Sequence, residues 1–190
     1  MKYNFGRDDW KKDFRYVYSL VAKSFCEFAC ADGHVLNGYN KSVGDYDYVS
    51  IAHNAVHGIG AKATVKCSFD HYGAPLLTFA NSVYTDENGV LRYGDHYEVV
   101  AYEKGCNVWY ITKAEEGSER PFKVENCVRI RFPIEEKTVF DFSVEVLDKA
   151  LRVEIGGIGF DIPAPHLAEK VHVGITACEG INRFYEAEIV

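Results

Sequence analysis

The sequence has few residues that interrupt regular structure, with only five prolines and one methionine among 190 residues. It also has no apolar run near the roughly 18–20 residues of a membrane-spanning helix, so we expect no membrane partner. The first twelve residues, MKYNFGRDDWKK, lack the apolar centre of a signal peptide. The scarcity of proline and the 47% of hydrophobic residues argue against a disordered chain. We therefore expect one folded domain over residues 1–190, with residues 1–22 as its lead-in segment, in the cytoplasm.

Positive charge is also scarce. The 28 Asp and Glu residues outnumber the 21 Lys and Arg residues, which gives a formal net charge of −7. The basic residues form no run along the sequence. Proteins that bind nucleic acids need a basic surface to displace counterions from the phosphates. The sequence therefore predicts no nucleic-acid partner.

No two cysteines have the CxxC spacing that is typical of metal and redox motifs. Most of the six lie inside alternating apolar segments: Cys26, Cys30, Cys67, Cys106, Cys127 and Cys178. A chain of this length can bury a sizeable core and does not need disulfides to be stable. We expect the cysteines to be small buried side chains in a reducing compartment.

What the sequence does contain is alternation of apolar and polar residues. In residues 62–70, Ala63, Val65, Cys67 and Phe69 alternate with polar residues, which is the period of a half-buried strand. Similar segments follow to the end of the chain, and turn residues separate them every 8–12 positions. We expect a hairpin at residues 96–111 and strands at residues 46–54, 62–70, 75–83, 122–132, 138–148, 150–155, 158–163, 171–179 and 182–190. The predicted fold class is all-β, an antiparallel β-sandwich or jelly roll.

The first 30 residues fit two patterns. Several apolar residues fall on one helical stripe, yet SFCEFACADG, which begins at Ser24, alternates like a strand and then turns. We expect a mostly non-helical segment followed by a strand near residues 23–31.

Four segments, in this order, resemble the concanavalin A-like lectin and glucanase jelly rolls: KATVKCSFDHYGAPLLTFANSV, HYEVVAYEKGCNVWYI, VFDFSVEVLDKALRVEIGGIGFDIP and VHVGITACEGINRFYEAEIV. In those domains a central hairpin precedes a second hairpin, and a final pair of strands returns to the N-terminal strand. The resemblance covers residues 22–190. It implies one concanavalin A-like domain that binds a glycan or glycoside on the concave face of a curved sheet.

The glycoside hydrolases of that superfamily carry a strand signature that resembles Glu-x-Asp-x-x-Glu. In the comparable place this chain has EVVAYE, residues 98–103, and the middle aspartate is missing. Glu98 and Glu103 are five positions apart, which places them on opposite faces of a regular strand. Hydrolysis by paired carboxylates needs both groups to face one sugar, at roughly 5–10 Å. The sequence therefore disfavours an ordinary retaining hydrolase that uses this pair.

The first strand of the central hairpin carries several functional side chains on one face, namely His96, Glu98, Val100 and Tyr102. A two-residue turn at residues 104–105 would pair Glu98 with Ile111, whereas a three-residue turn would pair Glu98 with Tyr110. Since a slip of one residue reverses the facing set, the sequence leaves the register open.

We predict Glu98 and His96 as the catalytic pair, because a carboxylate and an imidazole can exchange protons with a substrate. Trp109 is predicted as a stacking surface for a sugar ring, and a core tryptophan is its alternative. Other predicted ligand-binding residues lie on the same hairpin or at the ends of strands: Tyr102, Tyr110, Asp70, His71 and Arg183. Arg183 could instead pair with Glu179 across a turn.

A divalent metal is a further option for the cofactor. His53 and His57 are four positions apart, which on a helix would direct two metal ligands to one side. The segment instead has the pattern of a strand that runs into a glycine-rich loop. We therefore assign no residues to a metal.

Three functions fit these observations. The first is a lectin-like protein that binds a carbohydrate and performs no chemistry. The second is a hydrolase or lyase that acts on glycosides or keto-sugars through a His/Glu site, with or without a metal. The third is a non-catalytic subunit of a sugar-processing complex, or a homo-oligomer, because sheet edges and aromatic faces invite association. The missing catalytic signature favours the first.

Overall fold

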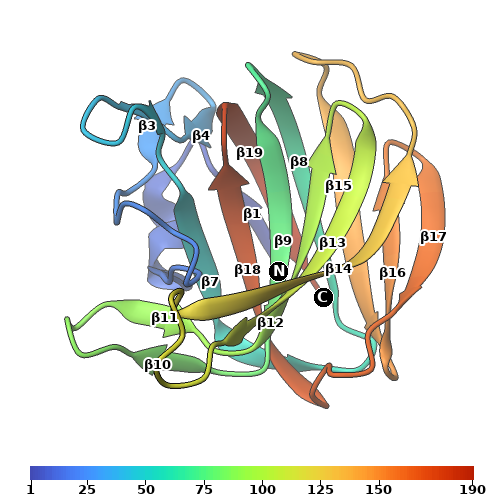
Figure 1. Ribbon diagram of the computed structural model, residues 1–190. Coiled ribbons are helices and arrows are strands. Elements are labelled where there is room, and N and C mark those ends of the chain that lie inside the picture. The colour runs from blue at the N-terminus through green and yellow to red at the C-terminus, as the bar shows by residue number, and fades with distance from the viewer.

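A computed structural model describes all 190 residues, and it shows two antiparallel sheets packed face to face (Figure 1). One sheet has eight strands, in the order β17 (Ile158–Pro163), β16 (Ala150–Ile155), β15 (Phe140–Leu147), β8 (Lys62–Asp70), β19 (Ile181–Ile189), β4 (His34–Leu36) and β3 (Ala29–Ala31), and β1 (Lys2–Asn4) also pairs with β19. The predicted antiparallel β-sandwich is thereby confirmed.

The second sheet has seven strands, in the order β14 (Phe122–Arg131), β13 (Gly105–Lys113), β12 (His96–Tyr102), β9 (Ala74–Ala80), β18 (Lys170–Cys178), β7 (Val49–Gly58) and β2 (Phe14–Tyr16). Outside the sheets lie one 3-10 helix, η1 (Asp8–Lys12), and two short hairpins, β5 (Tyr39–Asn40) with β6 (Asp45–Tyr46) and β10 (Val83–Thr85) with β11 (Leu91–Tyr93). The structure has no helix with the length and hydropathy of a membrane span.

The core lies between the sheets and follows the alternation of the sequence. On β8, Ala63, Val65, Cys67 and Phe69 all belong to a cluster of 36 buried apolar residues, as predicted. On β12 the core residues are the odd-numbered ones, such as Val99, so the even-numbered ones face outward. Each fully buried aliphatic or aromatic side chain contributes about 1.5–3 kcal/mol to stability. Two smaller apolar clusters, around Tyr93 and around Leu76, lie outside this core.

The N-terminal segment contributes a short strand to each sheet: β1 pairs with β19 of one sheet and β2 with β7 of the other. The strand expected at residues 23–31 is confined to Ala29–Ala31. The preceding backbone is held by side chains instead: the Tyr18 hydroxyl donates to the Cys26 carbonyl, and the Phe28 amide donates to the Tyr16 hydroxyl. Two backbone groups of this segment therefore have side-chain partners where a neighbouring strand would otherwise supply them.

The hairpin of β12 and β13 has a register that neither of the expected turns gives. Residues 103–104 form the turn, so Glu98 lies opposite Trp109. Gly105 is instead the first residue of β13, where the lack of a side chain allows β14 to approach. A Cβ at this position would collide with the Ile130 carbonyl oxygen, and the backbone φ of +126° also favours glycine. This register puts Glu98 and Trp109 side by side on the outward face.

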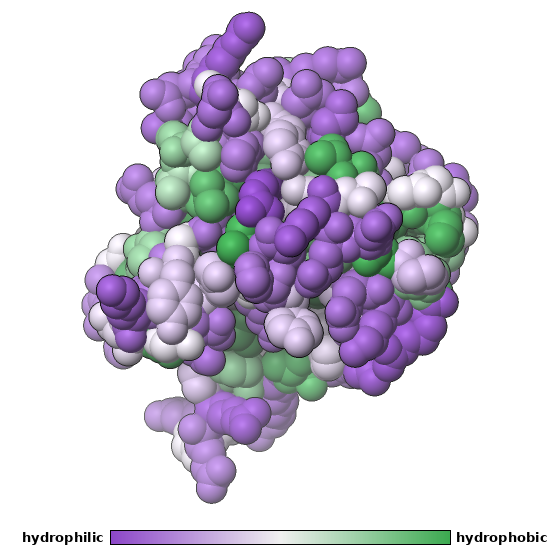
Figure 2. Space-filling model, turned by 90° about the horizontal axis from the view of Figure 1, so that it is seen from above, coloured by the Kyte–Doolittle hydropathy of each residue, from purple (hydrophilic) through white to green (hydrophobic).

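All six cysteines are free thiols. Cys67 and Cys106 are fully buried, whereas Cys30 is exposed, contrary to the expectation of burial. One end of the sandwich is mostly hydrophilic, and its apolar side chains form small separate patches (Figure 2). That face therefore offers no broad apolar surface for association.

Candidate functional site

A cavity of about 340 Å³ opens on the outer face of the seven-stranded sheet, at the end where β12 turns into β13. We call it the Glu98 cavity. Its lining residues come from the β8–β9 turn, from β9, from the β12–β13 hairpin and from the end of β18: Tyr72, Gly73, Ala74, Leu76, Glu98, Val100, Tyr102, Glu103, Lys104, Asn107, Trp109, Cys178 and Glu179. Three of the predicted site residues, Glu98, Trp109 and Tyr102, meet in it.

Glu98 is held in place by its neighbours. Its side chain is only 7% exposed, and its Oε1 accepts a 2.6 Å hydrogen bond from the Tyr48 hydroxyl. His96 Nε2 lies 3.4 Å from the same oxygen. Both contacts use Oε1, which leaves Oε2 free to accept a hydrogen bond from a ligand. Burial, and next the charge of Glu98, raise the pKa of Tyr48 well above its ordinary value, so Tyr48 remains a donor.

His96 is fully buried and its hydrogen bonds fix its tautomer. Nδ1 is 2.6 Å from the Gly94 carbonyl, which can only accept, so Nδ1 carries a proton. Nε2 is 3.0 Å from the Ser19 hydroxyl. Since neutral Nε2 can only accept, the contact between Nε2 and Glu98 is a hydrogen bond in two cases: an imidazolium Nε2 donates to the carboxylate, or a protonated carboxyl group donates to Nε2. The pair can hold one proton next to the cavity.

Tyr93 of β11 closes the adjoining part of the same face. It lies flat on the sheet at Gly174, where a Cβ would collide with the Tyr93 hydroxyl. That hydroxyl is 3.0 Å from Ser50 Oγ, which is 2.6 Å from Thr176 Oγ1. All these side chains are buried. Tyr93 thus covers the outward face at Gly174 of β18 and Ser50 of β7, beside the open part near Glu98 and Trp109.

The floor of the Glu98 cavity is apolar. Ala74, Leu76 and Val100 form a small cluster on the outer face, and Tyr102 and Trp109 pack against it while staying partly exposed. Aromatic rings beside a carboxylate suit a sugar, because the ring faces its C–H surface and the carboxylate binds its hydroxyls. The cavity has both kinds of contact.

A second cavity, of about 260 Å³, adjoins the first. Cys178 and Glu179 line both cavities, and Tyr48, which bonds Glu98, lines the second. We call it the Tyr46 cavity, after the residue of β6 in its wall; Lys23 and Asp45 also line it. The two cavities together extend the site across the ends of β18 and β12.

Four predicted ligand-binding residues lie outside the Glu98 cavity. Tyr110 is on the opposite face of β13, where its ring centroid is 4.7 Å from that of Tyr97 in the core. Asp70 is buried and pairs with Arg183 at 3.2 Å, so the alternative pairing of Arg183 with Glu179 is wrong. His71 is exposed in the turn after β8 and does not line the cavity.

Glu98 and Glu103 border the same cavity, which corrects the expectation of opposite faces. The expectation assumed a strand through residue 103, but β12 ends at Tyr102 and Glu103 belongs to the turn. Alternation no longer applies there, so the Glu103 side chain can reach the rim. It forms an ion pair with Lys104 at 2.8 Å.

Several lining residues were not found from the sequence. Tyr48 precedes β7 and Glu179 follows β18, both far from the hairpin in the sequence, and no local motif marks them. Tyr72 is a different case: it directly follows the predicted Asp70 and His71, is 75% exposed, and has a φ of +63°. Its neighbour His71 also has a positive φ, and two such non-glycine residues in a row turn the Tyr72 ring to the cavity rim.

The structure contains no group of three or more His, Cys, Asp or Glu side chains that could hold a metal ion. His53 and His57 both lie on the strand β7, where Nδ1 of His53 is 2.9 Å from Nε2 of His57. Nε2 of His53 is 2.9 Å from the Tyr3 hydroxyl. The ring nitrogens of His53 thus have hydrogen-bond partners in His57 and Tyr3, and we assign no residues to a metal.

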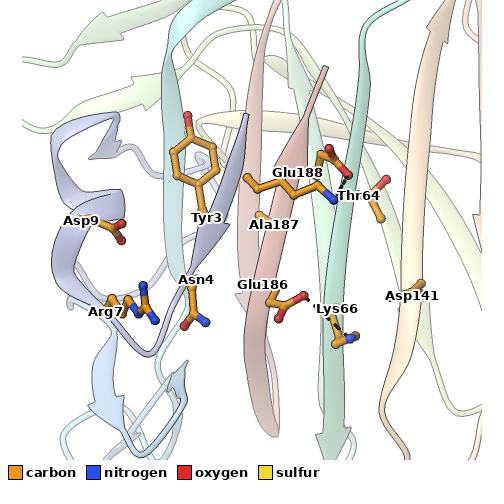
Figure 3. A pocket seen from close by; sticks show the side chains of 11 residues that line it. Tyr3, Asn4, Arg7, Asp9, Thr64, Lys66, Asp141, Glu186, Ala187 and Glu188 are labelled. Carbon is orange, nitrogen blue, oxygen red and sulfur yellow. Dashed lines mark ion pairs between the residues drawn. The ribbon is translucent and has the colours of Figure 1, made fainter.

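The opposite side of the molecule has a larger hollow, of about 490 Å³, which we call the Lys66 hollow (Figure 3). It lies on the outer face of the eight-stranded sheet and carries two ion pairs, Lys66–Glu186 at 3.8 Å and Lys2–Glu188 at 3.6 Å. Tyr3 and Ala187 are its only apolar lining residues. Exposed ion pairs of this kind are the usual surface of a solvated sheet, and no exposed ring faces the hollow.

The fold matches solved structures of carbohydrate-active proteins. β-Agarase A from Zobellia galactanivorans has a TM-score of 0.67 and 8% identity, over 100% of this chain and 87% of that chain. The κ-carrageenase from Pseudoalteromonas carrageenovora, solved with an oligotetrasaccharide of κ-carrageenan, has a TM-score of 0.64 and 8% identity, over 99% and 92%. Carbohydrate-binding module CBM66 from Bacillus subtilis has a TM-score of 0.59 and 9% identity, over 90% and 91%.

The protein has the concanavalin A-like jelly-roll fold, as the sequence resemblance predicted. Identities of 8–9% establish the fold alone. No protein-family model matches the chain, and no curated protein sequence matches it.

Proposed function

We propose that the protein binds a carbohydrate, and that the ligand lies in the Glu98 cavity. The observation that carries the proposal is the placement of Glu98 directly opposite Trp109, with Glu98 fixed by Tyr48 and its Oε2 free. A ligand hydroxyl can donate to this oxygen while a sugar ring lies against Trp109. Tyr102 adds a second ring at the rim. The shared fold of a carbohydrate-binding module and two polysaccharide-degrading enzymes supports the proposal by analogy.

A glycan array followed by calorimetric titration tests this function. Trp109→Ala is expected to weaken binding of the array's best glycan at least about tenfold, because a central aromatic contact carries much of the energy at such sites. Tyr185→Ala is the matched control, since Tyr185 is also half-buried but lies on the other sheet, where its hydroxyl bonds Ser68. Equal binding by both variants, or no binding of any glycan by the native protein, would contradict the proposal.

A second candidate is an enzyme that acts on glycosides or keto-sugars. The specific observation in its favour is the His96–Glu98 pair, which can hold a proton beside the cavity. Chromatography of bound glycans after long incubation would detect cleavage or elimination products. Turnover that persists unchanged in Glu98→Gln would remove Glu98 from such a mechanism, and intact glycans throughout would leave binding as the function.

We also propose that the protein works in the cytoplasm. The six free thiols support this proposal, because thiols of secreted proteins usually form disulfides. Fractionation of cells that produce the protein tests it, and recovery outside the cytoplasm would contradict it.

A further inference from the structure

The joined Glu98 and Tyr46 cavities carry carboxylates that lack basic partners. Glu98 lies in the first cavity, Asp45 in the second, and Glu179 lines both. None of the three forms an ion pair with a lysine or arginine within 4.0 Å. Two lysines line the cavities, and one of them, Lys104, is already paired with Glu103 at 2.8 Å. The net charge of the site is therefore negative.

The charges of these three carboxylates are all felt at one residue, Cys178, where the two cavities meet. Cys178 lies at the junction of the two cavities, and the pKa of its thiol is raised well above the ordinary value, first by burial and then by Glu98, Glu179 and Asp45. Lys23 opposes this effect and is the weakest of the named causes. Charges in a partly buried cavity are screened less than charges in water. A ligand at the junction therefore meets a negative potential.

We propose that this site selects saccharides without anionic groups and binds those with a basic amine most tightly. The inference rests on the proposed function and adds the chemical class of its ligand. An ammonium group can donate a charge-assisted hydrogen bond to the free Oε2 of Glu98. A sulfate or a uronate carboxylate would instead face Glu98 and Glu179 with no arginine to receive it. The Lys66 hollow differs in its charge pairing, because Lys66 and Lys2 form ion pairs with Glu186 and Glu188 there.

The test is a set of oligosaccharide probes that differ in charge: neutral glucose and N-acetylglucosamine oligomers, glucosamine oligomers, sulfated galactose oligomers and uronate-containing oligomers. Dissociation constants are measured for each at about 50 and 500 mM NaCl, where the Debye length changes about threefold. The amine-bearing probes are expected to bind at least about tenfold more tightly than the anionic probes at low salt, and the ratio should shrink at high salt.

Glu179→Gln is the informative variant, because Glu179 is exposed and its side chain makes no hydrogen bond, so the fold does not depend on its charge. It is expected to reduce the ratio between amine-bearing and anionic probes about threefold. Glu188→Gln, on the opposite sheet, is the matched control and should leave the ratio unchanged.

The outcomes separate the two proposals. Binding that ignores charge, or that favours sulfated or uronate probes, would overturn the ligand class while leaving carbohydrate binding in place. A ratio that falls equally in Glu179→Gln and Glu188→Gln would overturn the assignment of the preference to this site. A native protein that binds none of the probes, and no glycan of the array, would refute the proposed function itself.

Discussion

The outer faces of the two sheets hold their carboxylates in different ways. On the seven-stranded sheet, the side chain of Glu98 is 7% exposed and its Oε1 accepts a 2.6 Å hydrogen bond from Tyr48. On the eight-stranded sheet, the side chains of Glu186 and Glu188 are 58% and 41% exposed and face lysines at 3.8 and 3.6 Å. In both sheets the side chains of each strand point alternately toward the core and toward the outer face. The difference arises because loops and the β10–β11 hairpin cover part of one face, while β1 and η1 leave the other open.

The comparison shows why the larger hollow is the weaker candidate for a site. Exposed ion pairs are mobile and screened, and each contributes about 0–1 kcal/mol. A buried carboxylate with one fixed oxygen and one free oxygen is pre-organised for a ligand, and it loses little entropy when the ligand binds. Four stability measurements test whether the two faces differ in this way.

The largest effect is expected from Gly174→Val. The new side chain would collide with the Tyr93 hydroxyl, so Tyr93 must leave the sheet and its buried hydrogen bonds break. We expect the free energy of unfolding to fall by about 3 kcal/mol in urea titrations. Gly159→Val on the eight-stranded sheet is the control, because the nearest atom to its Cβ is 3.8 Å away and the stability should change by less than about 0.5 kcal/mol. Equal effects would mean that the two faces do not differ in packing.

A smaller loss is expected from Glu98→Ala. The change leaves the buried Tyr48 hydroxyl without its acceptor, which costs about 1–3 kcal/mol of unfolding free energy. Glu188→Ala removes only an exposed ion pair and should cost less than about 0.5 kcal/mol. Chemical denaturation of both variants gives the comparison. If Glu98→Ala were as stable as the native protein, Glu98 would not be structurally fixed.

Acid should weaken the seven-stranded side first. Burial lowers the pKa values of His53 and His57 on β7, and the charge of His53 lowers that of His57 further. The unfolded chain, with histidine pKa values of about 6.5, therefore takes up protons before the folded protein does. Stability is full above about pH 6.5 and declines as the pH falls below it. Urea titrations between pH 7 and about 5.5 measure the slope.

His57→Gln is expected to flatten that slope, and His71→Asn, at an exposed turn, should leave it unchanged. The Lys66 hollow contains no histidine and cannot supply this dependence. A stability that is constant or rises toward pH 5.5 would contradict the assignment.

The smallest effect is expected from the ion pair of Lys66 and Glu186. A double-mutant cycle with Lys66→Met and Glu186→Gln should give a coupling energy below about 0.5 kcal/mol, since both side chains are about half exposed. The coupling should vanish in about 1 M NaCl. A coupling energy above about 1.5 kcal/mol that persists in high salt would mean that Glu186 is held as firmly as Glu98, and that the two faces do not differ.

Much of the fold could be predicted from the sequence. The strands over residues 62–70 and 150–155 have the predicted bounds, and the sandwich class follows from the same alternation. Predictions were poorer where backbone groups find side-chain partners. Residues 22–28 form no strand, and there the Cys26 carbonyl and the Phe28 amide bond to the hydroxyls of Tyr18 and Tyr16. Alternation cannot reveal such hydrogen bonds, since the tyrosines lie before the segment they hold.

The site could be predicted only in part. Glu98, Trp109 and Tyr102 lie in one cavity, but both expected registers for the hairpin were wrong, because Gly105 is needed for the approach of β14. Tyr110 was predicted as a ligand contact on the basis of that open register and lies on the core side. That Glu98, Trp109 and Tyr102 contact a ligand stays a prediction.

The amino-acid sequence fixes the alternation of the side chains, and the two-layer sandwich follows from it. The outward direction of Glu98 and the residues around it depend on how the strands meet: Glu98 lies opposite Trp109, Tyr48 is 50 positions away in the chain, and Glu179 belongs to the turn after β18. The physical reason is that alternation depends on the local backbone, whereas register, burial and charge around a side chain depend on strands that meet only when the sheets close.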